Sequence, residues 1–132
     1  MDKRFEFIIH SGVKSVFISL HDKDKDVIVS HVILDMDGEY YRYKHFCNGD
    51  KIARIVRIET TPSYVGYGFG TKVMKKVLDY LDERGYNSYL LVSPQPRDVD
   101  KMRTLTDLRR FYSKFGFIKT KELLPTMFRK AK

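Results

Sequence analysis

The fold is decided by residues 61–81, "TPSYVGYGFGTKVMKKVLDYL". Pro62 comes near the start, and three glycines follow at alternate positions, 66, 68 and 70. Behind them, apolar residues recur at the i, i+3, i+4, i+7 spacing of an amphipathic helix, with lysines and aspartates between them. The apolar residues are Val73, Met74, Val77, Leu78 and Leu81. The stretch predicts a glycine-rich loop that opens directly into a helix, which ends near Gly85.

Segments typical of β-strands precede this loop. Runs rich in β-branched and aromatic residues lie at 5–10, 15–22, 26–36, 38–46 and 51–60. Asp37-Gly38 marks a hairpin turn before the fourth run. The last run alternates poorly between apolar and polar residues, so we expect a strand that is buried on both faces.

The same pattern continues behind the helix. Residues 86–93 predict a strand, and residues 105–115 predict a second helix, with Thr104 and Asp107 at capping-box spacing. One or two last strands follow Gly116, broken at Pro125. This order predicts an α/β (α+β) fold, a mixed sheet flanked by helices with at least one crossover. We expect a single domain over residues 1–132.

The composition suits a folded protein with anionic partners. Of 132 residues, 42% are hydrophobic, and the formal net charge is +8. That charge favours nucleic acid, an acidic protein face or a phosphorylated small molecule, without choosing among them. Cys47 is the only cysteine, and no run reaches about 18 apolar residues. We therefore expect a cytoplasmic protein without an internal disulfide or a membrane segment.

The glycine-rich loop has the properties of an anion site. Glycines present backbone N–H groups, and a helix N-terminus adds unsatisfied donors and a partial positive charge. A tight turn with glycines for close packing is the competing interpretation. Two phosphate motifs are excluded. Thr71-Lys72-Val73 after Gly70 lacks the Lys-Ser/Thr pair of a Walker loop, and the G-x-G-x-G spacing differs from the G-x-G-x-x-G of dinucleotide folds.

A second phrase, "FYSKFGF" at residues 111–117, ends the second predicted helix. With the loop, it resembles the core of the GNAT superfamily of N-acetyltransferases, over residues 54–118. In that family a proline follows strand 4, a loop [RQ]-x-x-G-x-[GA] opens the long helix, and F-Y-x-K-x-G-F ends the next one. The matching residues are Pro62, Gly68, Gly70, Phe111, Tyr112, Lys114, Gly116 and Phe117. The resemblance implies a mostly antiparallel sheet, splayed between strands 4 and 5.

The resemblance also implies acetyl-CoA as cosubstrate, bound in the gap between those strands. The backbone of Ile58, Glu59 and Thr60 would hydrogen-bond the pantetheine arm. The N–H groups of the loop would cradle the pyrophosphate. The loop residues are Val65, Gly66, Tyr67, Gly68, Phe69, Gly70 and Thr71. Val65 stands where the family usually has Arg or Gln, so one side-chain contact is lost.

Tyr112 is the catalytic residue that the resemblance implies, as the donor of a proton to the leaving thiolate. A phenol has a pKa of about 10 and a thiol one of about 8.5, so the phenol can donate as that charge develops. Its spacing from Leu108 and Phe115 also suits a packed aromatic on a helix face.

The general base is less well marked. The two-residue period gives one face of strand 4 to Ile52, Arg54, Val56, Ile58 and Thr60. Glu59 has the opposite parity, and we expect it to point away from this face, which makes it a weak candidate for the base. The proton of the attacking amine would then pass to Asp50, just before the strand, or to a water relay. Arg54 would suit an acidic group on the acceptor.

The acceptor and the function class stay open. Only residues 11–14 separate the first two strands, where the family has two helices, so the acceptor side is open to a protein amine or a small amine. The runner-up is a basic nucleic-acid-binding module, because aromatic and basic residues interleave in "EYYRYKHF" and the chain ends in "FRKAK". A third interpretation is a non-catalytic protein that binds acetyl-CoA and regulates.

Metal binding is not expected. The four histidines lie on separate segments without the spacing of metal ligands. His31, in the middle of a predicted strand, is a candidate base in the acceptor groove, although an ordinary side-chain hydrogen bond is the preferred interpretation. We expect a monomer or a homodimer.

Overall fold

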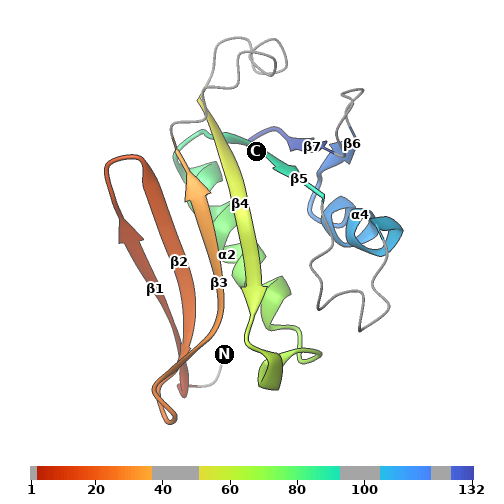
Figure 1. The fold of residues 1–132 in the computed structure, drawn as a ribbon. Helices are drawn as coiled ribbons and strands as arrows, with labels where there is room; N and C mark the ends of the chain where they lie inside the picture. Colours follow the sequence, from red (N-terminus) through yellow and green to blue (C-terminus); the bar gives the residue numbers. More distant parts are fainter. Residues whose placement is uncertain (1–2, 37–50, 93–104, 120–125) are drawn as a thin grey trace.

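The predicted strands join into one sheet. The structure, a computed structural model, describes residues 3–36, 51–92, 105–119 and 126–132. Within them the sheet has seven strands in the order β1-β2-β3-β4-β5-β7-β6 (Figure 1). They are β1 (Phe5–Ser11), β2 (Ser15–Asp22), β3 (Val27–Asp35), β4 (Ile52–Thr60), β5 (Asn87–Leu91), β6 (Ile118–Lys119) and β7 (Thr126–Arg129). β4 and β5 are parallel and the other neighbours antiparallel, so the predicted mixed sheet is confirmed.

Two α-helices flank the sheet in the described part of the chain. They are α2 (Phe69–Glu83) and α4 (Leu105–Ser113), and a short 3-10 helix, η2 (Pro62–Tyr64), follows β4. Both α-helices lie where the sequence predicts them. The predicted strand at 38–46, the Thr104 cap and the loop at 94–103 lie outside the described residues.

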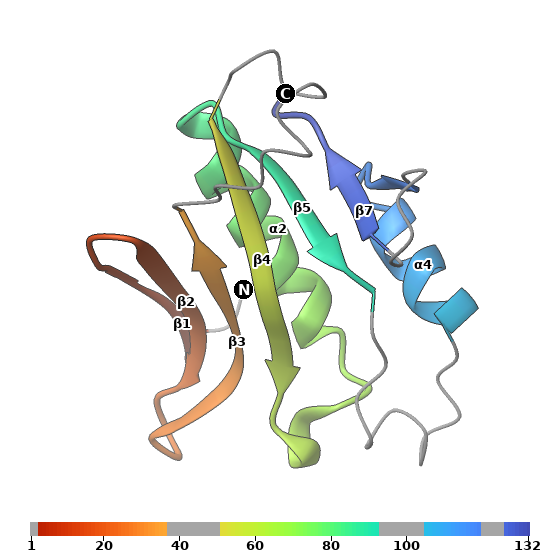
Figure 2. The ribbon, with the colours of Figure 1, turned by 45° about the horizontal axis from the view of Figure 1, so that its top comes forward.

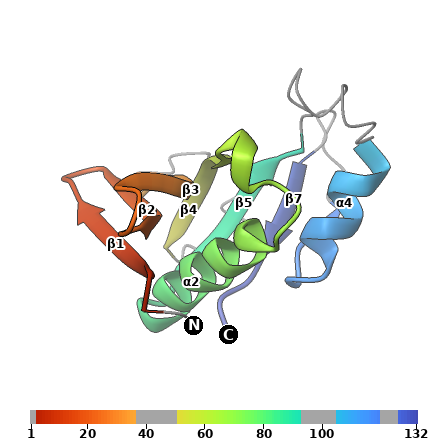
Figure 3. The same ribbon diagram turned by 90° about the horizontal axis from the view of Figure 1, so that it is seen from below.

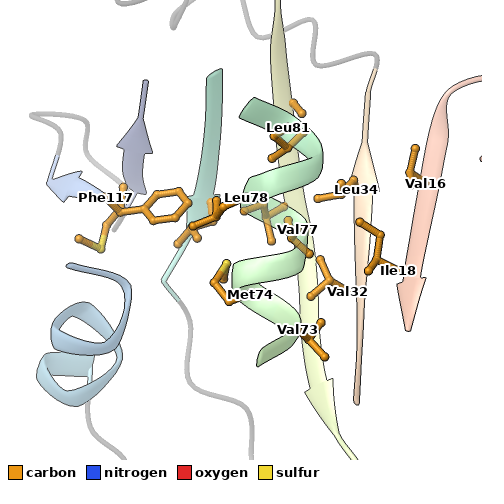
Figure 4. Packing of buried hydrophobic residues seen from close by; sticks show 14 of the residues in the cluster. Val16, Ile18, Val32, Leu34, Val73, Met74, Val77, Leu78, Leu81 and Phe117 are labelled. Carbon is orange, nitrogen blue, oxygen red and sulfur yellow. The ribbon is translucent and has the colours of Figure 1, made fainter. Parts of the chain in front are cut away.

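α2 forms one wall of the core because its apolar residues share one face. The buried residues are Val73, Met74, Val77, Leu78 and Leu81, as the helical spacing predicts (Figure 4). The helix ends where expected. Gly85 has a φ of 72°, a left-handed conformation that glycine adopts without steric cost, and its N–H donates to the carbonyl of Asp82 at 3.1 Å.

Both α-helices lie on the same side of the sheet (Figure 3). Leu108 of α4 and Phe117 just after it share one apolar cluster with α2 and with residues of β2, β3, β4 and β5. We call this side the helical face and the opposite side the far face. On the far face, the described residues form a small buried cluster of Ile52, Tyr89 and Phe128.

A buried ion pair fixes the C-terminal end of α2. Arg129 of β7, only 4% exposed, donates to both oxygens of Asp82 at 2.8 and 2.9 Å. Its Nε–H donates to the carbonyl of Phe115 at 2.9 Å. The hydrogen bonds from Arg129 lower the pKa of Asp82. This pair holds α2, the end of α4 and β7 together.

Truncation of the α2 face tests this account of the core. Leu81 is fully buried, so Leu81→Ala should lower the free energy of unfolding by about 2–5 kcal/mol, measured by urea denaturation. Val13 is wholly exposed, and Val13→Ala should change it by less than about 0.5 kcal/mol. Similar losses in both variants would contradict the packing described.

Candidate functional site

β4 and β5 separate partway along their length. Their register consists of three residue pairs, Ile52↔Asn87, Ala53↔Ser88 and Arg54↔Tyr89. Beyond them, β4 runs on beside β3 to Thr60, whereas β5 continues beside β7 (Figure 2). The predicted splay between strands 4 and 5 is confirmed.

A β-bulge interrupts β4 just after this separation. Ile33 and Leu34 are consecutive in β3, but their partners in β4 are Arg57 and Ile55. Val56 is therefore an extra residue between two paired positions. Because side chains alternate between faces with a period of two, one extra residue reverses which face each later side chain takes.

The sequence-based assignment of faces is consequently wrong for residues 58–60, which follow the bulge. Ile58 packs against the helical-face cluster, whereas Ile52 belongs to the far-face cluster. Glu59, expected to point away from the face of Arg54, shares the far face with it. The expected burial on both faces also fails here, since Val56 is 44% exposed. The poor alternation of apolar and polar residues along 51–60 is compatible with a bulge and equally with burial on both faces, so the sequence alone could not reveal the bulge.

On the far face, Glu59 is held between two partners. Its Oε2 lies 3.6 Å from Nε2 of His31, the residue opposite it in β3, and its Oε1 pairs with Arg57. Phe17 of β2 stacks on the His31 ring with the ring centroids 5.1 Å apart. The candidate base His31 is therefore part of a charged and aromatic cluster that four residues from three strands form.

The glycine loop, residues 65–68, connects η2 to α2. Gly66 and Gly68 have φ values of 94° and 81°, and a Cβ at either would have no atom within 4 Å. Glycine is required there by the left-handed backbone and not by crowding. Gly68 is the N-cap of α2, where no side chain caps the helix.

Unused donors collect at this end of α2. Within the described part of the chain, the backbone N–H groups from Gly66 to Thr71 donate no hydrogen bond to a protein acceptor. The Val65 N–H differs, since it already donates to the carbonyl of Pro62 at 3.3 Å. The first turn of α2 carries no acidic residue. Free N–H groups together with the positive end of the helix dipole make a binding site for an anion.

A buried carboxylate lies at the start of the glycine loop. Asp22, wholly buried, accepts a hydrogen bond from the Tyr64 hydroxyl at 2.7 Å and two from Arg4 at 2.9 and 2.6 Å. The backbone N–H groups of Asp24 and Lys25 also donate to it, at 3.1 and 3.4 Å. The hydrogen bonds from Arg4, then Tyr64, hold the pKa of Asp22 well below its usual range, and the bond to Asp22 raises the pKa of Tyr64.

Tyr112 lies on α4, half buried against the helical-face cluster. Its ring meets those of Phe111 and Phe117 edge to face, with centroid distances of 5.3 and 6.1 Å. Gly116, with a φ of 93°, turns the chain so that the Phe117 N–H donates to the Tyr112 carbonyl at 3.4 Å. The motif "FYSKFGF" thus forms the C-terminal end of α4, where the neighbouring rings hold the Tyr112 ring in place.

Further polar groups lie where β4 and β5 part. The Arg54 Nε and the Ser88 Oγ are buried, and neither has a hydrogen-bond partner within the described ranges. Asp35 stands opposite Arg54 in the β3–β4 register. Buried polar groups nearly always find a partner in native proteins, so this point of the sheet retains hydrogen-bonding capacity.

Only part of the predicted site is brought together in the described residues. Ile58, Glu59 and Thr60 lie on β4 beyond the separation, and the end of this strand adjoins the start of α2. A Cβ on Gly70 would lie 3.7 Å from Thr60 Oγ1. The predicted loop residues, Val65, Gly66, Tyr67, Gly68, Phe69, Gly70 and Thr71, follow directly. Asp50, the predicted base, lies outside the described residues.

Two other features are not found. Among the residues described, no three potential metal ligands gather into a group. None of the described helices has the length and apolar character needed to cross a membrane.

Comparison with known proteins agrees with this geometry. The model of the acetyltransferase (GNAT) family matches residues 2–117. The chain belongs to the GNAT acetyltransferase family. No curated protein sequence matches it.

Solved structures share the fold at low sequence identity. A KacTA–DNA complex is 15% identical, with 92% of this chain and 71% of that chain covered and a TM-score of 0.67. AtaTR bound with acetyl-CoA is 12% identical, with 89% and 68% covered and a TM-score of 0.64. The ribosomal-protein-S18-alanine N-acetyltransferase from Escherichia coli is 15% identical, with 92% and 72% covered and a TM-score of 0.61. These likenesses establish the fold alone.

The lowered pKa of Asp22 predicts a loss of stability in acid. The folded state keeps the Asp22 carboxylate ionised to a lower pH than the unfolded state does. The window runs from about pH 4, near the pKa of a free aspartate, down to the lower pKa of the folded state, and within it the unfolded state binds more protons. Stability contributed by Asp22 is present above this window and is lost as pH falls through it. Asp22→Asn should flatten the fall in thermal midpoint between pH 5 and pH 2.5, whereas the exposed Asp79→Asn should leave it unchanged. Equal slopes in all three proteins would contradict the assignment.

Proposed function

We propose that this chain transfers the acetyl group of acetyl-CoA to a primary amine, which attacks the thioester directly. The observation that carries the proposal is the row of unused N–H groups from Gly66 to Thr71, beside the end of β4. A diphosphate has the negative charge that such a row attracts. Membership of the GNAT family, and acetyl-CoA bound in AtaTR, support this choice of cosubstrate.

Two segments would hold the cosubstrate. The N–H groups of residues 66–71 would bind the pyrophosphate. The backbone of residues 58–60 would bind the pantetheine arm as an added strand, in the gap left by β5. The net charge of +8 would add long-range attraction for a cosubstrate with several phosphate charges.

The chemistry follows from this placement. The amine nitrogen attacks the thioester carbonyl carbon, and the oxyanion that forms needs a hydrogen-bond donor. The tetrahedral intermediate collapses with cleavage of the C–S bond, and the thiolate takes a proton from the Tyr112 hydroxyl. The proton lost by the amine passes to water or to a base, and solvent then reprotonates the tyrosine. The products are the N-acetylated amine and CoA.

Two candidates can accept the proton of the attacking amine in this proposal. Asp50 precedes β4, and a water relay needs no side chain. Glu59 is not one of them, because Arg57 and His31 already pair with its two oxygens. Arg54 lies at the separation of β4 and β5 with Nε unused, and this supports an acceptor that carries an acidic group.

The acceptor is proposed as a lysine or N-terminus of a protein, or a small amine. The Escherichia coli neighbour acts on an alanine of a ribosomal protein, which supports a protein acceptor in this fold. Nucleic-acid binding is the second candidate, because the structure of another neighbour is a complex with DNA. A non-catalytic protein that binds acetyl-CoA is the third. The single cysteine suits a reducing compartment, so we propose a cytoplasmic monomer or homodimer of one domain.

A matched pair of glycine variants tests the anion site. Gly68 and Gly85 both have left-handed φ values with open space around a Cβ, at opposite ends of α2. Each change to alanine should cost about 1–2 kcal/mol of stability. Only Gly68→Ala should weaken acetyl-CoA binding, by about tenfold in Kd by calorimetry, since only it moves the donors. No binding of acetyl-CoA by the unaltered protein, with salt-sensitive binding of a DNA duplex instead, would overturn the proposal in favour of the second candidate.

Tyr112→Phe tests the leaving-group role. Loss of a general acid should lower kcat by about 10² or more, while acetyl-CoA affinity stays within about twofold. The rate is measured as free thiol released with a competent amine. Tyr80→Phe on α2, a half-buried tyrosine with no assigned role, is the control and should keep the full rate. An unchanged kcat in Tyr112→Phe would show that solvent protonates the thiolate.

A further inference from the structure

The glycine loop receives little support from its own surroundings. A Cβ at Gly66 or Gly68 would meet no atom within 4 Å, so no part of the described structure packs on the side of the backbone where a side chain would lie. Two glycines among four residues also make this stretch of backbone unusually free in the absence of restraints. A row of N–H donors binds an anion well only if it is already in place, because ordering it on binding costs affinity. Tyr67, the residue between the two glycines, is 72% exposed, and its ring contacts that of Phe69 at the exit of the loop, with a centroid distance of 6.4 Å. The contacts that order the loop are therefore found at its ends.

Tyr64 is connected to both ends of the glycine loop. It is the last residue of η2, directly before the loop, and its hydroxyl donates to Asp22 at 2.7 Å. Its ring meets the edge of Phe69, the first residue of α2, at a centroid distance of 5.8 Å. Phe69 in turn packs on Phe5 of β1 at 5.0 Å. One side chain thus links the entry of the loop to the exit.

Asp22 fixes the position of the Tyr64 hydroxyl. Its side chain is fully buried and receives two bonds from Arg4 in addition to the one from Tyr64. The backbone N–H groups of Asp24 and Lys25 hold the same carboxylate in the turn between β2 and β3. A buried carboxylate with all its bonds made has little freedom to move. The strands of the N-terminal half thereby hold the loop that precedes α2.

We propose that Tyr64 and Asp22 are positioning residues, which hold the glycine loop in the conformation that binds the diphosphate of acetyl-CoA before the ligand arrives. This inference rests on the proposed function. Neither residue touches the ligand in this proposal. Their effect is on the order of the N–H groups from Gly66 to Thr71, and therefore on cosubstrate affinity and not on the chemical step.

The chain offers a matched control in Asp82. This carboxylate also accepts two bonds from one arginine, Arg129, and its pKa is lowered in the same way. It lies at the opposite end of α2, about 20 Å from Gly68 at 1.5 Å per helical residue. Asp82→Asn therefore removes a comparable structural ion pair without touching the loop.

The variant that tests the proposal is Tyr64→Phe, which keeps the ring contact with Phe69 and removes only the hydroxyl. Asp22→Asn is the second variant. Calorimetry with acetyl-CoA should give a Kd raised about five- to tenfold in Tyr64→Phe and unchanged within twofold in Asp82→Asn, although Asp82→Asn lowers the thermal midpoint. With a competent amine and saturating acetyl-CoA, kcat should stay within about twofold in Tyr64→Phe, so the loss lies in KM.

A measurement on the protein without ligand separates this inference from the proposed function. Amide order parameters at Gly66 and Gly68 should be near those of rigid backbone, about 0.85, in the unaltered protein and in Asp82→Asn, and should fall below about 0.6 in Tyr64→Phe. Unchanged order parameters and an unchanged Kd in Tyr64→Phe would overturn the inference, and so would an equal rise in Kd in Asp82→Asn. If the unaltered protein binds no acetyl-CoA, the proposed function fails, while the order parameters still decide whether Tyr64 holds the loop.

Discussion

The parting of β4 from β5 is the constraint on which the rest of this structure depends. A sheet gains stability from every paired residue, yet these two parallel strands pair over three residues and then diverge. The divergence leaves backbone along β4 that β5 does not cover, and it brings the end of β4 to the N-terminus of α2. The glycine loop lies at this junction, where the left-handed residues Gly66 and Gly68 connect η2 to the start of α2. Strand edge and helix end thus meet in one place.

The bulge at Val56 belongs to the same arrangement. It reverses the alternation of side chains just after the separation, so that Ile58 supports the core while Glu59 turns to the far face. If β4 alternated regularly through Val56, Glu59 would share a face with Ile55 and point into the apolar cluster under α2, where an unpaired charge is costly. The far face instead receives Glu59 with partners on two strands. The bulge therefore keeps the charge of Glu59 out of the apolar core.

Local features of the sequence predicted much of this. The helical period of Val73 to Leu81 depends only on residues within the helix, and the left-handed glycines are marked by their type, so α2 and the loop lie where expected. The splay and the role of "FYSKFGF" came from resemblance to a family. The direction of Glu59 could not be predicted, since a bulge depends on pairing between two strands and not on the spacing along one. The carboxylate under Tyr64 could not either, because Arg4, Asp22 and Tyr64 come from three distant segments and carry no shared pattern.

The short ladder between β4 and β5 has a mechanical consequence. The sheet consists of two antiparallel halves, β1 to β4 and β5 with β7 and β6, and three residue pairs join them edge to edge. α2 spans this seam, since its apolar face packs on strands of both halves (Figure 4). Cohesion between the halves therefore comes from side-chain packing beneath the sheet more than from hydrogen bonds within it. The relative orientation of the two halves is therefore set by the side chains of α2 that contact both of them, and not by the ladder alone.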